Sequence, residues 1–206
     1  MRRSTKGWDT MMITDGAAGD AAGPSVAVRG SEVKRSFRDE ALAEFDMLYR
    51  IAVQLTSDRP SAKRLLEKTI LTAYRSWEDR PDELEPRVWI AQVLVREHRC
   101  LFDVDEEAEE EQADRWARAA TFLNEAFMDE HARAAVMRNL RPAVVRRAIG
   151  RLPQSARRVL ALSDIAGFSY SQLASVLDST VCEVKKRLHA ARDLVKWILA
   201  TDMKQV

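Results

Sequence analysis

Beyond Phe37, apolar residues recur at steps of three and four through most of the chain, which predicts amphipathic helices. The first helix is expected over about residues 38–56. It ends because the run of Thr, Ser, Asp, Arg and Pro at residues 56–60 interrupts the pattern. Pro60 suits the first turn of a second helix, because its missing N–H has no helical partner there, and that helix continues to about Trp77. A third helix is expected over about residues 84–100, and together the three would form one compact bundle.

The helical period returns in the C-terminal half of the chain. It covers about residues 113–137, then a short helix that closes at Gly150, then a helix that opens at Leu152 and ends at Gly167. The alternation of apolar and polar residues that marks strands is hard to find, and the 206 residues include only 7 Gly and 6 Pro. The expected fold class is therefore all-α.

Two short helices joined by a tight turn are predicted after Gly167. Ser169 can cap the first helix, because its hydroxyl accepts a hydrogen bond from a backbone N–H that has no partner inside the helix. Residues 178–180 are Asp, Ser and Thr, whose side chains bond their own backbone and favour a turn. Val184 and Leu188 then continue an apolar stripe along the second helix.

The second helix carries a polar, mostly cationic face opposite its apolar stripe. In a helix-turn-helix unit the second helix docks on the first with one side and enters the major groove of DNA with the other. An ordinary helical hairpin with a solvated basic face would show the same pattern. The residues that we expect to contact DNA are Thr180, Glu183, Lys185, Lys186, Arg187, His189 and Arg192.

A formal net charge of +1 conceals a strong asymmetry along the chain. Residues 141–206 contain 12 Lys and Arg against 5 Asp and Glu, whereas residues 101–130 contain 2 Lys and Arg against 11 Asp and Glu. A basic end favours a polyanionic partner, and an acidic run is typical of a flexible spacer because like charges repel one another.

These patterns predict four parts of the chain. Residues 1–36 lack apolar periodicity and are expected to form a disordered tail. Residues 37–100 would form the first helical domain, residues 101–139 an acidic linker with a bridging helix, and residues 140–206 a DNA-binding domain. We expect the linker to hold the two helical domains apart, so that the second can lay its cationic helix against duplex DNA.

Several classes of protein are excluded or disfavoured by what the sequence lacks. Cys100 and Cys182 show no metal-ligand spacing and are expected to be reduced thiols in a cytoplasmic protein. No signal peptide and no membrane span are found. No phosphate-binding Gly loop, HExxH motif or nucleophile–base pair points to an enzyme, and we expect no catalytic residue, metal site, cofactor or small-molecule substrate.

The helix-turn-helix stretch and its surroundings resemble region 4 of bacterial sigma factors, above all the extracytoplasmic-function group. The matching residues are Leu152-Pro153, the run from Arg157 to Tyr170, Leu173-Ala174 and the run from Val181 to Arg192. The first helical domain resembles region 2 of the same group. Its matching residues are Leu48 to Ala52, Leu55 to Asp58, Leu65-Leu66, Thr69, Leu71, Ala73-Tyr74, Trp77 and Arg87 to Ile90.

This resemblance implies a promoter-specificity subunit whose partners are core RNA polymerase, promoter DNA and an anti-sigma factor. Region 2 would bind the polymerase clamp and melt the downstream promoter element. Region 4 would hold the polymerase flap and recognise the upstream element through its second helix. The linker would thread toward the RNA exit path, where its acidic residues could mimic nucleic acid.

The sequence departs from the family pattern at three places, and at one of them Arg96 and Cys100 lie near the positions where the third helix usually carries an Asn and an Asp. The second helix of region 2 usually presents acidic residues to the polymerase clamp, whereas the corresponding candidates here are Lys63, Arg64, Glu67 and Lys68. Reversing several charges at a charge-matched interface would cost several kcal/mol. At the start of the recognition helix, Glu183 suits the helix dipole but would repel a phosphate, although it can accept from cytosine N4.

Two functions therefore remain open at this point. The first is a working sigma factor of the extracytoplasmic-function type. The alternative is a diverged sigma-like regulator or mimic that binds DNA or a protein partner without opening promoters, and the cationic residues at 61–68 motivate it.

Overall fold

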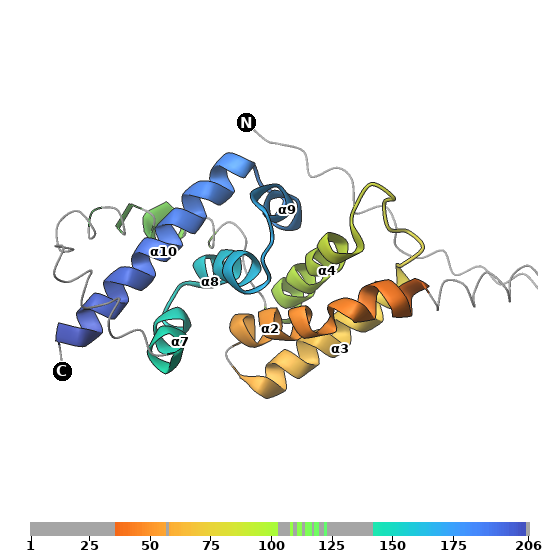
Figure 1. Ribbon diagram of the computed structural model, residues 1–206, viewed down its shortest axis with the longest axis horizontal. Helices are drawn as coiled ribbons and strands as arrows, with labels where there is room; N and C mark the ends of the chain where they lie inside the picture. Colours follow the sequence, from red (N-terminus) through yellow and green to blue (C-terminus); the bar gives the residue numbers. More distant parts are fainter. Residues whose placement is uncertain are drawn as a thin grey trace, which may run out of the picture.

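The computed structural model describes residues 36–56, 58–102 and 142–204, with scattered positions between 108 and 122. All regular structure within these residues is helical, which confirms the predicted all-α class (Figure 1). The predictions made for residues 1–35 and for most of the linker lie outside the described residues. We call residues 36–102 the first module and residues 142–204 the second module.

The first module is a bundle of three α-helices preceded by two short helical turns. Asp58 caps the second α-helix, with its carboxylate accepting from the Ser61 N–H at 2.8 Å, and Pro60 lies in the first turn as predicted. The predicted helix over 38–56 is instead divided into a π-turn, a 3-10 turn and an α-helix. The elements are η1 (Phe37–Ala41), η2 (Leu42–Glu44), α2 (Phe45–Thr56), α3 (Arg59–Arg75) and α4 (Pro86–Leu101).

The second module contains four α-helices and one π-turn. Its third helix begins after Gly167, whose φ of +73° lies in the left-handed region that glycine adopts without strain, so the predicted break at this residue is confirmed. The elements are α7 (Pro142–Gly150), α8 (Gln154–Leu160), η3 (Ala161–Ile165), α9 (Tyr170–Val176) and α10 (Val181–Lys204).

Helices α9 and α10 form the predicted helix-turn-helix. The Ser169 hydroxyl accepts from the Gln172 N–H at 3.3 Å, and the Gln172 side chain accepts from the Ser169 N–H at 2.9 Å. This reciprocal capping box confirms Ser169 as the cap of α9. Between the helices, Asp178 takes a φ of 49°, a conformation that a short polar side chain tolerates, and reverses the chain.

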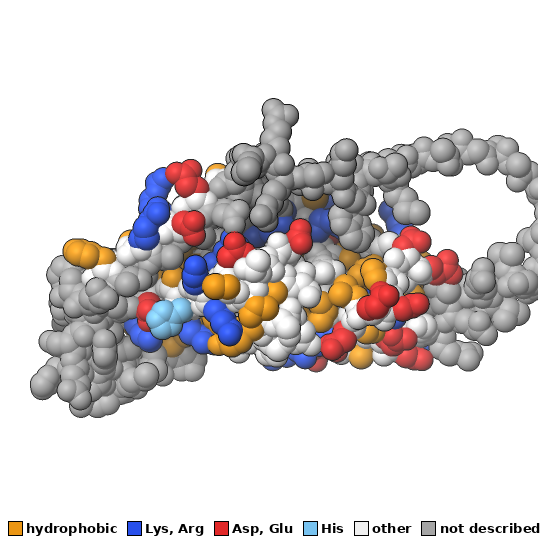
Figure 2. All heavy atoms as spheres, turned by 90° about the horizontal axis from the view of Figure 1, so that it is seen from above, with side chains coloured by type: hydrophobic (Ala, Val, Ile, Leu, Met, Phe, Trp, Pro, Cys, Tyr) orange, Lys and Arg blue, Asp and Glu red, His pale blue; other side chains and the backbone are white. Residues whose placement is uncertain are grey.

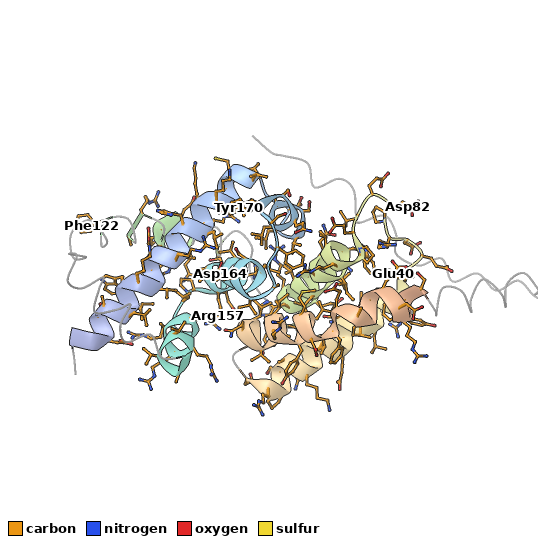
Figure 3. The ribbon with its side chains drawn as sticks, viewed as in Figure 1. Glu40, Asp82, Phe122, Arg157, Asp164 and Tyr170 are labelled. Atoms are coloured by element: carbon orange, nitrogen blue, oxygen red, sulfur yellow. The ribbon has the colours of Figure 1, made fainter. Side chains whose placement is uncertain are left out.

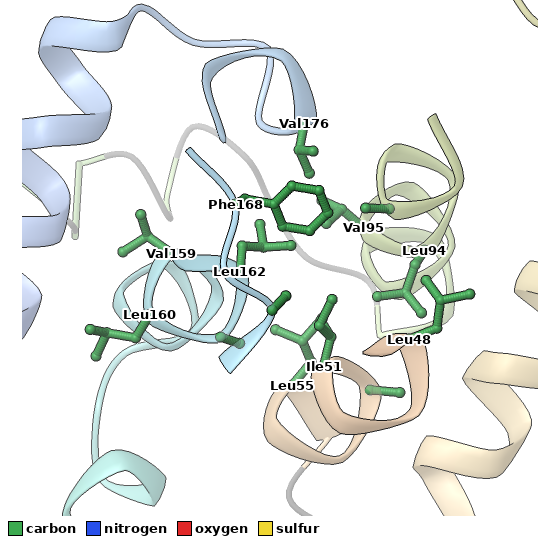
Figure 4. Close-up of a cluster of buried hydrophobic side chains, with 14 of the residues drawn as sticks. Leu48, Ile51, Leu55, Leu94, Val95, Val159, Leu160, Leu162, Phe168 and Val176 are labelled. Atoms are coloured by element: carbon green, nitrogen blue, oxygen red, sulfur yellow. The ribbon is translucent and has the colours of Figure 1, made fainter. Parts of the chain in front are cut away.

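The two modules are packed against each other, so the expectation that they are held apart is wrong for this structure. Leu55 of α2 and Leu94 of α4 belong to the same buried cluster as Leu162 of η3 and Phe168, and Figure 4 shows these side chains converging. All four side chains are at most 4% exposed. Each module alone would leave these apolar faces in water, and their mutual burial removes that cost.

Candidate nucleic-acid interface

The position of α10 is fixed by one buried stripe along its length. Val184, Leu188 and Ala191 are at most 2% exposed and follow one another at steps of four and three residues. These side chains dock α10 onto α8 and α9 within the second module. Docking by one face leaves the opposite face of the same helix directed away from the core (Figure 1).

The residues predicted to contact DNA lie around the open part of this helix. Thr180, Glu183, Lys185, Lys186, His189 and Arg192 are exposed, and Arg187 is partly buried. At 3.6 residues per turn, Lys186 points almost directly opposite the buried stripe, and His189 points within about 50° of that direction. Lys185 and Arg187 flank them on either side. The early turns of α10 therefore present a cationic surface to solvent, as a major-groove helix requires.

Thr180 and Glu183 form a second capping box, which the sequence analysis missed. The Glu183 carboxylate accepts from the Thr180 N–H at 3.0 Å, from the Thr180 hydroxyl at 2.8 Å and from the Ser179 hydroxyl at 3.0 Å. These bonds, led by the one from the Thr180 N–H, lower the pKa of Glu183 to about 2. The Thr-x-x-Glu spacing was the signal that could have revealed this role.

Arg192 is held at the side of the helix by an acidic partner. Its guanidinium lies 2.5 Å from the Asp164 carboxylate on η3, and Figure 3 shows Asp164 under α10. The hydrogen bond that Arg192 donates to the Asp164 carboxylate raises the pKa of Arg192 above its ordinary range. The nearby Lys185 ammonium lies 5.4 Å from the centre of the Tyr170 ring, a cation–π contact between α10 and α9. Both cations thus also brace the helix-turn-helix unit.

His189 contacts the same carboxylate as a lysine about two turns farther along α10. Its Nε2 lies 3.2 Å from Asp193, and the Lys196 ammonium donates to the same carboxylate at 2.9 Å. Asp193 is only 9% exposed, and its negative charge offsets the positive charge of Lys196 in this part of α10. The cationic surface is therefore strongest in the first turns of α10, near Lys185 and Lys186.

Charge is unevenly distributed over the described residues: the C-terminal segment is basic as the sequence predicted, whereas most of the predicted acidic run of residues 101–130 lies outside the described residues. In Figure 2, Lys and Arg side chains gather at the end where α10 lies, and Asp and Glu side chains are densest at the opposite end. The acidic end includes the exposed loop residues Asp82 and Glu83 between α3 and α4. A polyanion would be attracted to the α10 end of the molecule.

The candidate polymerase-binding residues lie together on the exposed face of α3. Lys63, Arg64, Glu67 and Lys68 are all exposed. Lys63 lies 3.7 Å from Glu67, and Lys68 lies 3.2 Å from Glu97 of α4. Two of the cations on this face thus have acidic neighbours, which moderates its positive charge.

A groove on the second module was not foreseen from the sequence. It has a volume of about 390 Å³ and lies between α7, α8, η3 and α10. Charged side chains, among them Arg157 and Lys196, stand among its apolar lining. The apolar lining residues are Val145, Ile149, Leu160, Ala161, Ile165, Val195 and Leu199. An apolar helix of a partner would match such a surface.

Other candidate chemistry is not assembled in the described part of the chain. No three His, Cys, Asp or Glu side chains among these residues gather as metal ligands. Cys100 and Cys182 are exposed free thiols. No helix in the described ranges is both long and apolar enough to cross a bilayer.

Known proteins match this chain at two scales. A family model matches the part that contains the helix-turn-helix, and a relative aligns with most of the chain. The family model described as "Sigma-70, region 4" matches residues 143–195, which span α7 to the middle of α10. The ECF RNA polymerase sigma factor EcfG of Rhodopseudomonas palustris (strain TIE-1) is 28% identical over 170 residues. That alignment covers 81% of this chain and 87% of EcfG.

Two solved structures share the fold. The sigma factor RpoE, crystallised with the anti-sigma factor NepR from Bartonella quintana, gives a TM-score of 0.57 at 19% identity, covering 82% of this chain and 99% of RpoE. CnrH, in complex with the cytosolic domain of CnrY, gives a TM-score of 0.54 at 19% identity, covering 85% of this chain and 95% of CnrH. The likeness extends over both modules, so the relatives resemble the chain in more than its helix-turn-helix.

Proposed function

We propose that this chain, which belongs to the extracytoplasmic-function group of bacterial sigma factors, directs RNA polymerase to promoters and so initiates transcription. One observation carries the proposal: the N-terminal part of α10 lies within the stretch matched by the region 4 model, and there the helix is buried along one face and cationic along the other. Such a helix can hold its position in the protein while it enters the major groove.

Within this function, α10 recognises the upstream promoter element. Lys186 and His189 face outward, where they meet base edges or phosphates, and Lys185 and Arg187 flank them. Glu183 acts mainly on the helix itself, because its carboxylate is engaged by the Thr180 N–H and hydroxyl. Thr180 is likewise a capping residue whose exposed position lies near the DNA backbone.

Core polymerase binds through surfaces of both modules in this proposal. The exposed face of α3 with Lys63, Arg64, Glu67 and Lys68 meets the polymerase, and the ion pairs of Lys63 with Glu67 and of Lys68 with Glu97 reduce the positive charge that this face presents. The groove between α7, α8 and α10 receives an apolar element of the polymerase, such as its flap.

The chain acts in the cytoplasm, where the polymerase works, and it acts as a regulator without catalytic chemistry of its own. An anti-sigma factor is a natural further partner, since RpoE and CnrH were each solved in complex with a protein that binds them. Such a partner would compete for the same polymerase-binding surfaces.

Reconstituted transcription tests the proposal directly. The full chain is mixed with core RNA polymerase and a library of genomic DNA fragments, and the 5′ ends of the transcripts are sequenced. We expect start sites that share an upstream motif and that disappear with the Lys186→Glu, Arg187→Glu double variant. If the chain binds DNA but yields no promoter-specific transcript, the alternative of a regulator that does not open promoters replaces this function.

A further inference from the structure

Arg87, the second residue of α4, connects three separate parts of the chain. Its guanidinium donates to the backbone carbonyl of Ala166 and stacks 4.8 Å from the centre of the Phe168 ring, both in the second module. Its Nε lies 3.6 Å from the Glu44 carboxylate in the first module. A charge-assisted hydrogen bond and a cation–π contact thus fasten α4 to the turn that precedes α9.

Two further hydrogen bonds fasten α4 along α9. The Gln92 side-chain amide donates to the Ser175 carbonyl at 2.8 Å, near the end of α9. The Gln172 amide donates to the Glu85 carboxylate at 2.8 Å, near the start of α9. The first helix of the helix-turn-helix is therefore held by α4 at both of its ends.

The DNA-facing helix is left outside this contact. The cationic residues Lys185 and Lys186 on α10 are exposed while the modules are docked. α10 packs on α7, α8 and α9. The surface that docks the modules and the surface that would meet DNA are therefore different sides of the helix-turn-helix.

We propose that Arg87 latches the two modules into a resting form that still binds duplex DNA through α10. Opening the latch releases the first module and uncovers the apolar side chains of Leu94 and Phe168, while α10 is unchanged. The docking thus determines whether the first module is free and its apolar side chains are accessible, and it does not affect DNA binding by α10. The part that concerns DNA rests on the proposed function, whereas the latch does not.

Arg80 offers a closely matched control for Arg87. It too lies 3.6 Å from a carboxylate, that of Glu40, donates to a backbone carbonyl, that of Leu84, and stacks 4.8 Å from an aromatic ring, that of Trp77. All of these partners belong to the first module. Arg80→Ala therefore removes the same kinds of contact without touching the junction between the modules.

The two cysteines allow the docking to be measured in the full chain. Cys100 lies on α4 and Cys182 on α10, both are exposed, and the sequence contains 2 cysteines in all. Nitroxide labels on both report the distance between the modules by pulsed electron resonance. We expect one short distance in the parent and in Arg80→Ala, and an added longer distance in Arg87→Ala. The ratio of docked to open chains should fall about tenfold, which is about 1.4 kcal/mol.

Loss of folding is separated from opening by a second variant and a second measurement. Gln92→Ala removes one exposed hydrogen bond at the junction and should shift the same distance distribution by a smaller amount. Far-ultraviolet circular dichroism of each variant should match the parent. A distance distribution in both junction variants that equals the parent's overturns the latch.

DNA binding is measured on unlabelled protein by fluorescence anisotropy with a mixed-sequence duplex of about 30 base pairs at low salt. We expect the parent, Arg80→Ala and Arg87→Ala to bind with affinities within about twofold of one another. Binding by Arg87→Ala that is at least about fivefold tighter would mean that docking masks α10, and would overturn the proposal. Absence of binding by all three proteins would overturn the proposed function, whatever the distances show.

Discussion

Thr180 and Glu183 are joined by reciprocal hydrogen bonds at the start of α10. The Thr180 hydroxyl donates to the Glu183 carboxylate at 2.8 Å, and the Glu183 N–H donates to Thr180 Oγ1 at 3.2 Å. The Thr180 N–H donates to the same carboxylate at 3.0 Å. This reciprocal pair fixes where the helix begins and hence the direction in which it leaves the turn. The orientation of Lys186 toward solvent depends on that direction.

Glu183→Ala should destabilise the protein, because it removes the acceptor for two donors of Thr180. We expect a loss of about 1 kcal/mol in the free energy of unfolding, as for other capping residues. Chemical denaturation at pH 7 measures it. Glu67→Ala is the control, since Glu67 is an exposed carboxylate paired with the exposed Lys63, and its loss should change stability by less than about 0.5 kcal/mol. Equal losses in both variants would contradict the capping role.

Lys186→Glu combined with Arg187→Glu should abolish binding to the upstream element while helix content stays unchanged. The reversal places negative charge where α10 approaches DNA, and the residues are outside the buried stripe. A gel-shift titration at fixed salt measures the affinity. The matched control is Lys63→Glu with Arg64→Glu on α3, which makes the same change of net charge elsewhere and should weaken binding far less. Unaltered affinity in the α10 variant would show that this face does not meet DNA.

Substitutions of Arg192 and of its partner Asp164 distinguish a DNA-binding role of the Arg192 cation from a structural one. Arg192→Ala removes a charge near the proposed interface and should weaken binding and lower the salt dependence by about one ion. Asp164→Ala frees the guanidinium from its partner at 2.5 Å and should leave affinity equal or greater. Salt titrations of both variants measure these effects. Equal weakening by the two substitutions would show that the ion pair serves only to brace α10 on η3.

His98 should make stability depend on pH below neutrality. The side chain is fully buried, and burial, aided by the positive charge of Arg158, lowers its pKa from 6.5 to about 4. Between about pH 4 and pH 6.5, the His98 imidazole is therefore mostly protonated in the unfolded chain and mostly neutral in the folded chain. The stabilisation is complete above about pH 6.5 and is lost as the pH falls to about 4, by roughly 2–3 kcal/mol.

Denaturation between pH 7 and pH 4 tests this, with His98→Gln as the variant because an amide does not titrate in this range. The variant should lose much of the slope of stability against pH that the parent shows. His189→Gln is the control, since His189 is exposed on α10 and its substitution should leave the slope nearly intact. A parent slope that survives in His98→Gln would assign the acid sensitivity to other groups.

Much of the candidate site could be predicted because it depends on neighbours in the sequence. Ser169 caps α9 and Gly167 ends the segment before it, and both act within a few residues of their own position. The exposure of Lys185 and Lys186 follows from helical period alone once Val184 and Leu188 are buried. The pairing of Arg192 with Asp164 was not predictable, since 28 residues and a turn separate them.

The sequence by itself determined the all-α class, the breaks near Pro60 and Gly167 and the two faces of α10, because a helix is built from hydrogen bonds and side-chain spacings that span only three or four residues. Tertiary structure alone decided that the two modules share a core and that Arg87 joins them. Arg87 meets Ala166 across 79 residues of chain, and Gln172 meets Glu85 across 87. Such contacts depend on whether two apolar faces fit each other in space, which no local pattern records.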